Sequence, residues 1–149
     1  MSIFNPDSFL QQETTQATEA KYTPIPEAEY RATVDDVTSG LSSKKSVPFL
    51  NVTFEIHDEN LRKQLGMEHV RVNMNLWLDL TETGAIEVGP NKNVKLGKLR
   101  EALGQNQSGQ AWSPLMMKGK GPVVILVSQR KDENDPEVVY NDVKRVTKG

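Results

Sequence analysis

Residues 70–80 read Val-Arg-Val-Asn-Met-Asn-Leu-Trp-Leu-Asp-Leu, and apolar and polar side chains alternate there without a break in parity. Successive side chains of a β-strand point to opposite faces, so this stretch predicts one long strand with its apolar face toward a core. The side chains of the alternate positions must then face outward, and one of them is a tryptophan. The outward side chains are Arg71, Asn73, Asn75 and Trp77.

Four shorter runs predict the other strands of a sheet. They are rich in β-branched residues and are separated by turn residues such as Gly40 and the glycines of 118–122. In the second run, Phe49, Asn51 and Thr53 have the outward parity. The fourth run is uniformly apolar at its start, which predicts a strand covered on both faces. We expect strands over 29–37, 49–56, 123–130 and 138–146.

One helix is expected between the third and fourth strands. Over 92–103, Val94, Leu96, Leu99 and Leu103 recur at roughly helical spacing, and Gly104 follows as a C-cap. Three strands, one helix and two strands is the element order of the OB fold, a five-stranded Greek-key barrel, although other antiparallel folds share it. We therefore predict a mainly β, OB-fold-like barrel with one helix between strands three and four.

The first 23 residues differ from the rest of the chain. They contain a polar run without apolar periodicity, so we expect a polar N-terminal arm, partly disordered. Asn5 before Pro6 fits an N-cap and a first helical position, which predicts a helical turn or two through about Glu13. Phe9 and Leu10 could pin this turn to the domain, or the arm could dock to a partner. Residues 24–149 are expected to form a single OB-like domain.

Composition excludes most enzyme chemistry. The chain has no cysteine, so it has no thiolate metal site, disulfide or cysteine nucleophile. The two histidines, His57 and His69, flank an expected turn and are predicted to be exposed rather than catalytic. The acidic pairs at 35–36 and 58–59 consist of adjacent residues, which point in different directions. We predict no enzyme, no catalytic residue, no metal and no cofactor.

Two further features bear on cellular location. No run approaches eighteen apolar residues, and the polar N-terminus lacks the basic-then-apolar layout of a signal peptide. We expect a soluble intracellular protein with no membrane partner.

The net charge of -2 conceals a division along the chain. Residues 1–39 carry two basic and seven acidic side chains, for a net charge of -5. Residues 40–130 carry twelve basic and eight acidic side chains (net +4), and residues 131–149 carry four and five (net -1). A basic centre of this kind could meet phosphate, although so small a difference also arises by chance.

The outward parity of the second and third strands predicts a nucleic-acid site. OB folds bind ligands across the outer face of these strands and the adjoining loops. An exposed tryptophan beside amides and a guanidinium is typical of a base-stacking platform, where stacking contributes about 1–3 kcal/mol per base, and nearby lysines could contact phosphates. We predict a platform of Arg71, Asn73, Asn75, Trp77 and Phe49, an electrostatic track of Lys44, Lys45, Lys118 and Lys120, and a second tier of Tyr140, Lys144 and Arg145.

Each of these assignments has a structural alternative. Trp77 could cap one end of the barrel, Phe49 could be tucked under the first loop, and each lysine alone could be a solvated surface charge. Trp112 is expected to anchor its loop rather than to contact a ligand. The acidic residues of 132–135 lie where a DNA-binding barrel would favour positive charge, and they count against this hypothesis.

Short motifs along nearly the whole chain resemble a family of bacteriophage early proteins that is similar to OB-fold single-stranded DNA-binding proteins. The motifs are Ile3-Phe4-Asn5-Pro6 with Phe9-Leu10, Ile25-Pro26-Glu27-Ala28-Glu29-Tyr30, Phe49-Leu50-Asn51-Val52-Thr53-Phe54, the helix from Lys95-Leu96-Gly97-Lys98-Leu99 to Leu103-Gly104, and Tyr140-Asn141-Asp142-Val143-Lys144.

The resemblance implies a sequence-nonspecific, non-catalytic protein that covers single-stranded DNA in phage replication or recombination. Its expected location is the host cytoplasm, and its partners would include phage or host replication and recombination proteins. The alternative is an interaction adaptor of the same machinery, or a virion accessory protein, that binds protein through the barrel and the N-terminal arm. Monomer and dimer both remain open.

Overall fold

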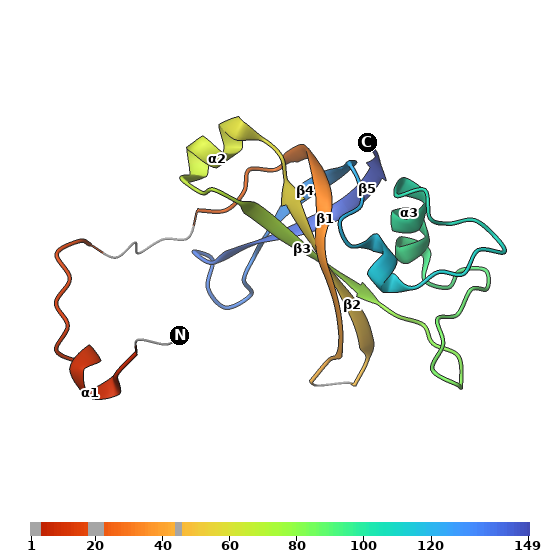
Figure 1. The fold of residues 1–149 in the computed structure, drawn as a ribbon, viewed down its shortest axis with the longest axis horizontal. Helices are drawn as coiled ribbons and strands as arrows, with labels where there is room; N and C mark the ends of the chain where they lie inside the picture. Colours follow the sequence, from red (N-terminus) through yellow and green to blue (C-terminus); the bar gives the residue numbers. More distant parts are fainter. Residues whose placement is uncertain (1–3, 18–22, 44–45) are drawn as a thin grey trace.

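The computed structural model describes residues 4–17, 23–43 and 46–149 (Figure 1). Within these residues, five strands form one antiparallel sheet, which confirms the prediction of a mainly β fold. In chain order the strands are β1 (Ala28–Leu41), β2 (Pro48–Ile56), β3 (Val70–Trp77), β4 (Val123–Lys131) and β5 (Val139–Lys148). The helices are α1 (Pro6–Phe9), α2 (Glu59–Leu65), α3 (Val94–Ala102) and the 3-10 helix η1 (Pro114–Met117).

The sheet is open, with the order β3-β2-β1-β4-β5 and the long β1 at its centre. The first residues of β1 pair with β4, and from Ala32 onward β1 pairs with β2. The register shifts between Val34 and Asp36, so the strand carries a bulge, which bends a strand and increases its twist. The two edge strands, β3 and β5, thereby approach each other, with Cα atoms within 8 Å.

The chain that precedes β4 is bonded to β1 beside this bulge. The backbone N–H of Val34 donates to the carbonyl of Lys120 at 2.9 Å, and the N–H of Gly119 donates to the carbonyl of Val34 at 2.7 Å. A Cβ added at Gly121, where φ is +134°, would lie 3.1 Å from the carbonyl oxygen of Ala32. Glycine is therefore required for this close backbone approach.

The apolar parity of the strands forms one core. In β3 the burial alternates strictly from residue to residue, as its sequence predicts, and all described buried side chains are apolar or tyrosine. α3 adds Leu96, Leu99 and Ala102 to the same core, which confirms the expected helix and its place between the third and fourth strands. The largest fully buried side chains include Phe54, Leu76 and Ile125.

Three features differ from the sequence predictions. β3 ends at Trp77 instead of Leu80, because the chain then turns and Leu80 pairs with Ile86 in an isolated bridge. α2 was not predicted, although Asp58 caps its N-terminus and Gly66 ends it with φ at 64°. β4 is not covered on both faces, since its burial alternates and ends in exposed residues.

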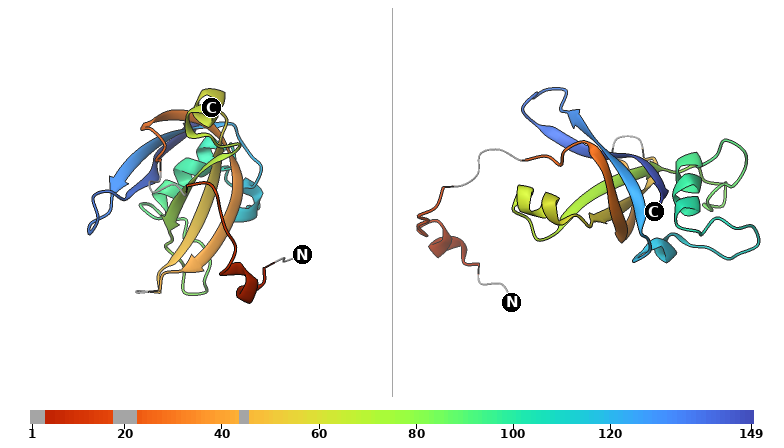
Figure 2. Two further views of the ribbon diagram at one scale, coloured as in Figure 1. Left: turned by 90° about the vertical axis from the view of Figure 1, so that its left-hand side faces the viewer. Right: turned by 90° about the horizontal axis from the view of Figure 1, so that it is seen from above.

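The predicted N-terminal helical turn is confirmed as α1. The Asn5 side chain accepts hydrogen bonds from the N–H groups of Asp7 (3.0 Å) and Ser8 (3.4 Å), as an N-cap does. The rings of Phe4 and Phe9 lie 5.0 Å apart. Figure 1 and the right-hand view of Figure 2 show α1 set apart from the sheet. No helix in the described part of the chain has the length and apolar character needed to cross a membrane.

Candidate nucleic-acid interface

The outward face of β2 and β3 carries four cross-strand pairs in register. They are Phe49 with Trp77, Asn51 with Asn75, Thr53 with Asn73, and Glu55 with Arg71. The β3 members are exposed and the β2 members are half-buried, so the prediction that these two rows face outward is confirmed. We call this face the platform. That it binds DNA stays a prediction.

The aromatic end of the platform is formed by Trp77 and Phe49. Trp77 is 58% exposed, which contradicts the alternative that it caps one end of the predicted barrel. The Phe49 ring meets it at a centroid distance of 5.7 Å and an interplanar angle of 69°, an edge-to-face arrangement. Phe49 is half-buried against Gly40 of β1, where an added Cβ would lie 3.0 Å from the tip of the ring. The Trp77 side chain is therefore mainly exposed beside a second ring that is held against β1.

The middle of the platform is a ladder of amides and one hydroxyl. The Asn51 amide donates to Oδ1 of Asn75 at 2.6 Å, and the Thr53 hydroxyl donates to Oδ1 of Asn73 at 2.7 Å. These cross-strand bonds hold both β3 amides by their oxygens. The amide nitrogens of Asn73 and Asn75 are left as donors at the edge of the sheet.

The charged end of the platform differs from the prediction. Arg71 lies on the outward face, but its Nε is 3.1 Å from Asp35 Oδ2 and a terminal nitrogen is 3.7 Å from Glu55 Oε1. Asp35 occupies the β1 bulge. His69 Nδ1 also lies 3.4 Å from Glu55, and both histidines are exposed as predicted. Since two carboxylates contact the guanidinium, the charge of Arg71 is less available to an anionic ligand than its position in the sequence suggests.

The predicted lysine track is only partly described. Lys44 and Lys45 lie outside the described residues. Lys118 and Lys120 follow η1, and Lys118 Nζ lies 3.6 Å from Asp36 Oδ1. Asp36 pairs with Thr53 across β1 and β2, so Lys118 reaches the platform from the β1 side. Lys120 is exposed.

The second tier on β5 is divided by a register shift. Lys144 is skipped in the pairing with β4, so Lys144 and Arg145 do not alternate as in a regular strand. Arg145 pairs with Glu29 of β1 at 3.0 Å and lies outside the lining of the pocket described next. Tyr140 and Lys144 do line that pocket.

This pocket, of about 700 Å³, lies between the two edge strands, and we call it the seam pocket. Asn73 and Asn75 of β3 line it together with Tyr140 and Lys144 of β5. The structure thus brings platform residues and second-tier residues to one site. The remaining lining residues are Glu27, Met74, Lys95, Ser128, Gln129, Arg130, Asn141, Asp142 and Val143. Sequence reasoning did not find Lys95 or Arg130, because the alternation of one strand carries no information about what lies across the seam.

Tyr140 is held at the rim of the seam pocket. Its hydroxyl donates to Asp132 Oδ1 at 3.2 Å, and the guanidinium of Arg130 lies 5.0 Å from the ring centroid. The hydrogen bond to Asp132, followed by the charge of that carboxylate, raises the pKa of Tyr140 above 10. Arg130 is itself bonded to Asp142 at 2.9 Å, which raises the pKa of the guanidinium. The ring is 42% exposed and stays neutral at neutral pH.

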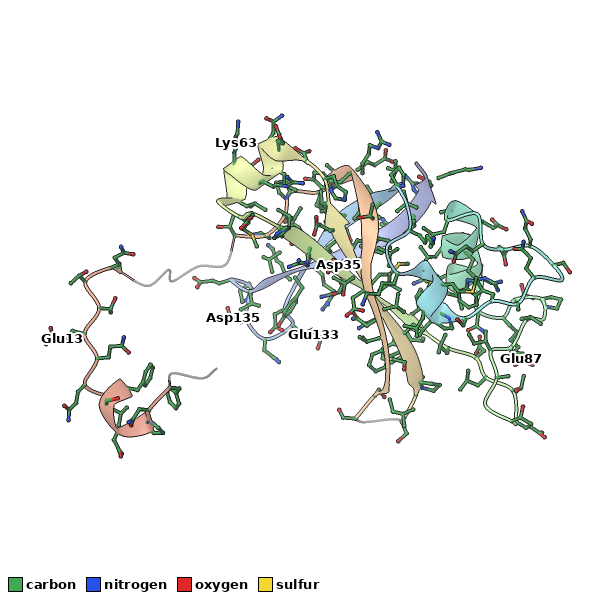
Figure 3. All side chains as sticks on the ribbon, in the orientation of Figure 1. Glu13, Asp35, Lys63, Glu87, Glu133 and Asp135 are labelled. Carbon is green, nitrogen blue, oxygen red and sulfur yellow. The ribbon has the colours of Figure 1, made fainter. Side chains whose placement is uncertain are left out.

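The acidic β4–β5 turn counts less against DNA binding than its sequence suggests. Asp132 accepts hydrogen bonds from the N–H groups of Asn134 and Asp135, both at 3.1 Å, and from Tyr140. It therefore shapes the turn. Figure 3 shows Glu133 and Asp135 near each other at the turn, away from the end of the sheet where Glu87 lies.

Trp112 anchors its loop, as predicted. Its indole N–H donates to Gln105 Oε1 at 3.0 Å, and Arg100 lies 4.0 Å over the ring. Burial lowers the pKa of Arg100. Trp112 packs partly buried against the core, so Trp77 is the exposed indole of the described chain.

Within the described ranges, no group of three His, Cys, Asp or Glu side chains could hold a metal ion. Neither a protein-family model nor a curated protein matches the chain.

Proposed function

We propose that this chain is a non-catalytic, sequence-nonspecific single-stranded DNA-binding protein of OB type. The observation that carries the proposal is the exposed indole of Trp77, next to Phe49 and at the end of an amide row. A nucleobase can lie flat on such a ring, and every base has a π-face, so stacking of this kind tolerates sequence. The amides and Lys118 would hold the rest of the nucleotide.

The sheet order supports the OB assignment. In an OB barrel the first strand pairs with the second and the fourth, and the third and fifth strands close the barrel. Here β1 has those two partners, and β3 and β5 are the edges that approach each other. The platform then occupies the face that OB folds use for ligands.

The biological setting follows from the sequence resemblance alone. The protein would cover single strands during phage DNA replication or recombination, in the host cytoplasm, and pass them to phage or host replication and recombination proteins.

Tryptophan fluorescence tests the proposal directly. With Trp112→Phe as background, emission comes from Trp77, and a 12-mer of deoxythymidine should quench it. The quenching should weaken steeply with salt, because phosphate contacts release counterions. Trp77→Leu should bind at least about fivefold more weakly, as expected from about 1–3 kcal/mol per stacked base.

The control is the melting temperature of Trp77→Leu. It should match the wild type, because the indole is mainly solvent-exposed. The proposal fails if the oligonucleotide produces no quenching at low salt, or if a folded Trp77→Leu keeps the wild-type affinity.

A second candidate function, a protein-interaction adaptor, is favoured by a different pocket. It has a volume of about 570 Å³ at the far end of the β1–β2 hairpin, and its lining is mainly apolar. The lining includes the exposed Leu41, Leu80 and Leu115. Absence of DNA binding, together with dimerisation or capture of a replication protein that Leu115→Glu abolishes, would favour this function.

A further inference from the structure

The seam pocket has a different character from the aromatic end of the platform. Its lining is rich in amides, hydroxyls and cations, and it adjoins the platform because Asn73 and Asn75 belong to both. Asn75 is two residues from Trp77 on the same strand, so about 6.6 Å separates their positions. A nucleotide next to the one stacked on Trp77 therefore comes within reach of Asn75 and the pocket.

The open hydrogen-bonding groups of the pocket are mainly donors. Asn73 and Asn75 have their oxygens engaged by Thr53 and Asn51, which leaves two amide NH₂ groups. Lys95 and Lys144 add ammonium groups, and neither makes an ion pair within the described residues.

The acceptors in the lining are mostly engaged by the protein itself. Asp142 binds Arg130 at 2.9 Å, and Glu27 accepts from the backbone N–H of Gln129 at 2.9 Å. The Asn141 side chain bonds the backbone of Ile25 in both directions. A ligand that binds the open amide and ammonium groups of Asn73, Asn75, Lys95 and Lys144 must supply acceptors to them.

We propose that the seam pocket binds one base of the single strand by its carbonyl oxygens, and so favours thymine and uracil over cytosine. This inference rests on the proposed function and adds a base preference to it. Thymine presents two carbonyl oxygens, and its N3–H can meet a remaining acceptor such as the Ser128 hydroxyl. Cytosine keeps O2 and has a second acceptor at N3, but it replaces the other carbonyl by an amino group, a donor that would face the amide donors of Asn73 and Asn75.

The test compares the affinities of 12-mers of deoxythymidine, deoxyuridine and deoxycytidine. The wild-type chain should bind the first two equally and about fivefold more tightly than the third, the size of one net hydrogen bond. Asn73→Asp and Asn75→Asp keep the oxygen that β2 binds and replace the NH₂ donor with an acceptor. Each should lower all affinities and reduce the thymidine-to-cytidine ratio to one or below.

Thr38→Asp is the matched control. Thr38 is exposed on the outward face of β1, opposite Asn51, and does not line the seam pocket. Its new carboxylate should lower all three affinities and leave the ratio at about five.

The possible outcomes separate this inference from the function on which it rests. If the oligonucleotides quench Trp77 but the ratio is the same in Asn73→Asp as in the wild type, the pocket does not recognise the base, and any thymidine preference comes from strand flexibility. The inference is then wrong and the proposed function stands. If no oligonucleotide quenches Trp77, both are wrong. Melting temperatures close to wild type are expected for all three variants, whose side chains lie outside the core.

Discussion

At the scale of single residues, neighbouring side chains decide what an exposed group can do. Trp77 stays mainly exposed beside Phe49, whose ring lies at an edge-to-face angle to the indole and is itself held against Gly40. Arg71 lies in the same row, but its charge is matched by Asp35 and Glu55. Trp77 and Arg71 lie on the same face of β3, but only Trp77 is free of strong interactions that a ligand would have to replace.

Removing one of these carboxylates should strengthen DNA binding. Asp35→Asn frees Arg71 from its shorter ion pair, so affinity for a deoxythymidine 12-mer should rise, and the slope of log K against log salt should steepen by up to about one. Arg71→Gln should change affinity little, because Asp35 and Glu55 already match the charge of the guanidinium. A large loss in Arg71→Gln would show that the guanidinium contacts phosphate despite its partners.

Tyr30 makes stability depend on pH in the alkaline range. Its hydroxyl donates to the carbonyl of Pro26 at 2.7 Å, and burial, followed by the charge of Asp58, raises its pKa above 10. The unfolded phenol titrates near 10, so the stabilisation is present below about pH 10 and is lost as the pH rises through the folded pKa.

Tyr30→Phe should lower the free energy of unfolding by about 1 kcal/mol at pH 8, the contribution of one hydrogen bond. Above about pH 10 the difference between the variant and the wild type should shrink. Urea titrations at several pH values measure both effects. A difference that stays constant through the alkaline range would mean that the phenol does not titrate above its ordinary pKa.

At the scale of secondary-structure elements, β1 organises both the sheet and the platform. It pairs with two strands in turn, and its bulge places Asp35 beside Arg71. Near its end, Gly40 leaves room for the Phe49 ring to lie across the strand. The platform therefore depends on three strands, although only two of them carry the predicted ligand contacts.

Gly40→Ala should separate stability from binding. Alanine in a strand favours folding by about 0.5–1 kcal/mol relative to glycine, so the melting temperature should not fall. The new methyl would displace the Phe49 ring from Trp77, so the near-UV circular dichroism should change and affinity for deoxythymidine should fall severalfold.

Gly97→Ala in α3 is the control, because an added Cβ there meets nothing within 4 Å. It should leave both the near-UV spectrum and the affinity unchanged. Wild-type affinity and spectrum in Gly40→Ala would show that Phe49 does not position Trp77.

At the scale of the whole molecule, the approach of β3 and β5 creates a site that neither strand has alone. Ile25, which precedes β1 in the chain, is also fixed at this end of the sheet. Ile25 is buried, and its backbone is held by Asn141 and Gln129. The folded domain therefore includes Ile25, while no residue of α1 is buried.

A chain that begins at residue 24 should therefore fold as the full chain does. Its melting temperature should lie within about 4 °C of the full chain, equivalent to less than about 1 kcal/mol. Thermal unfolding followed by circular dichroism measures this. A loss of cooperative unfolding would show that the first 23 residues belong to the domain.

Sequence patterns were sufficient for the five strands and for α3, and alternation was sufficient for the outward row from Arg71 to Trp77. The reason is that the direction of a side chain is a property of its own strand, with a period of two residues. α2 could also have been found, because Asp58 and Gly66 are local capping signals.

Only the tertiary structure decided the neutralisation of Arg71 and the seam pocket. Each depends on the register between segments far apart in the chain, such as the bulge that brings Asp35 of β1 to Arg71 of β3. That register is set by the packing of the whole core.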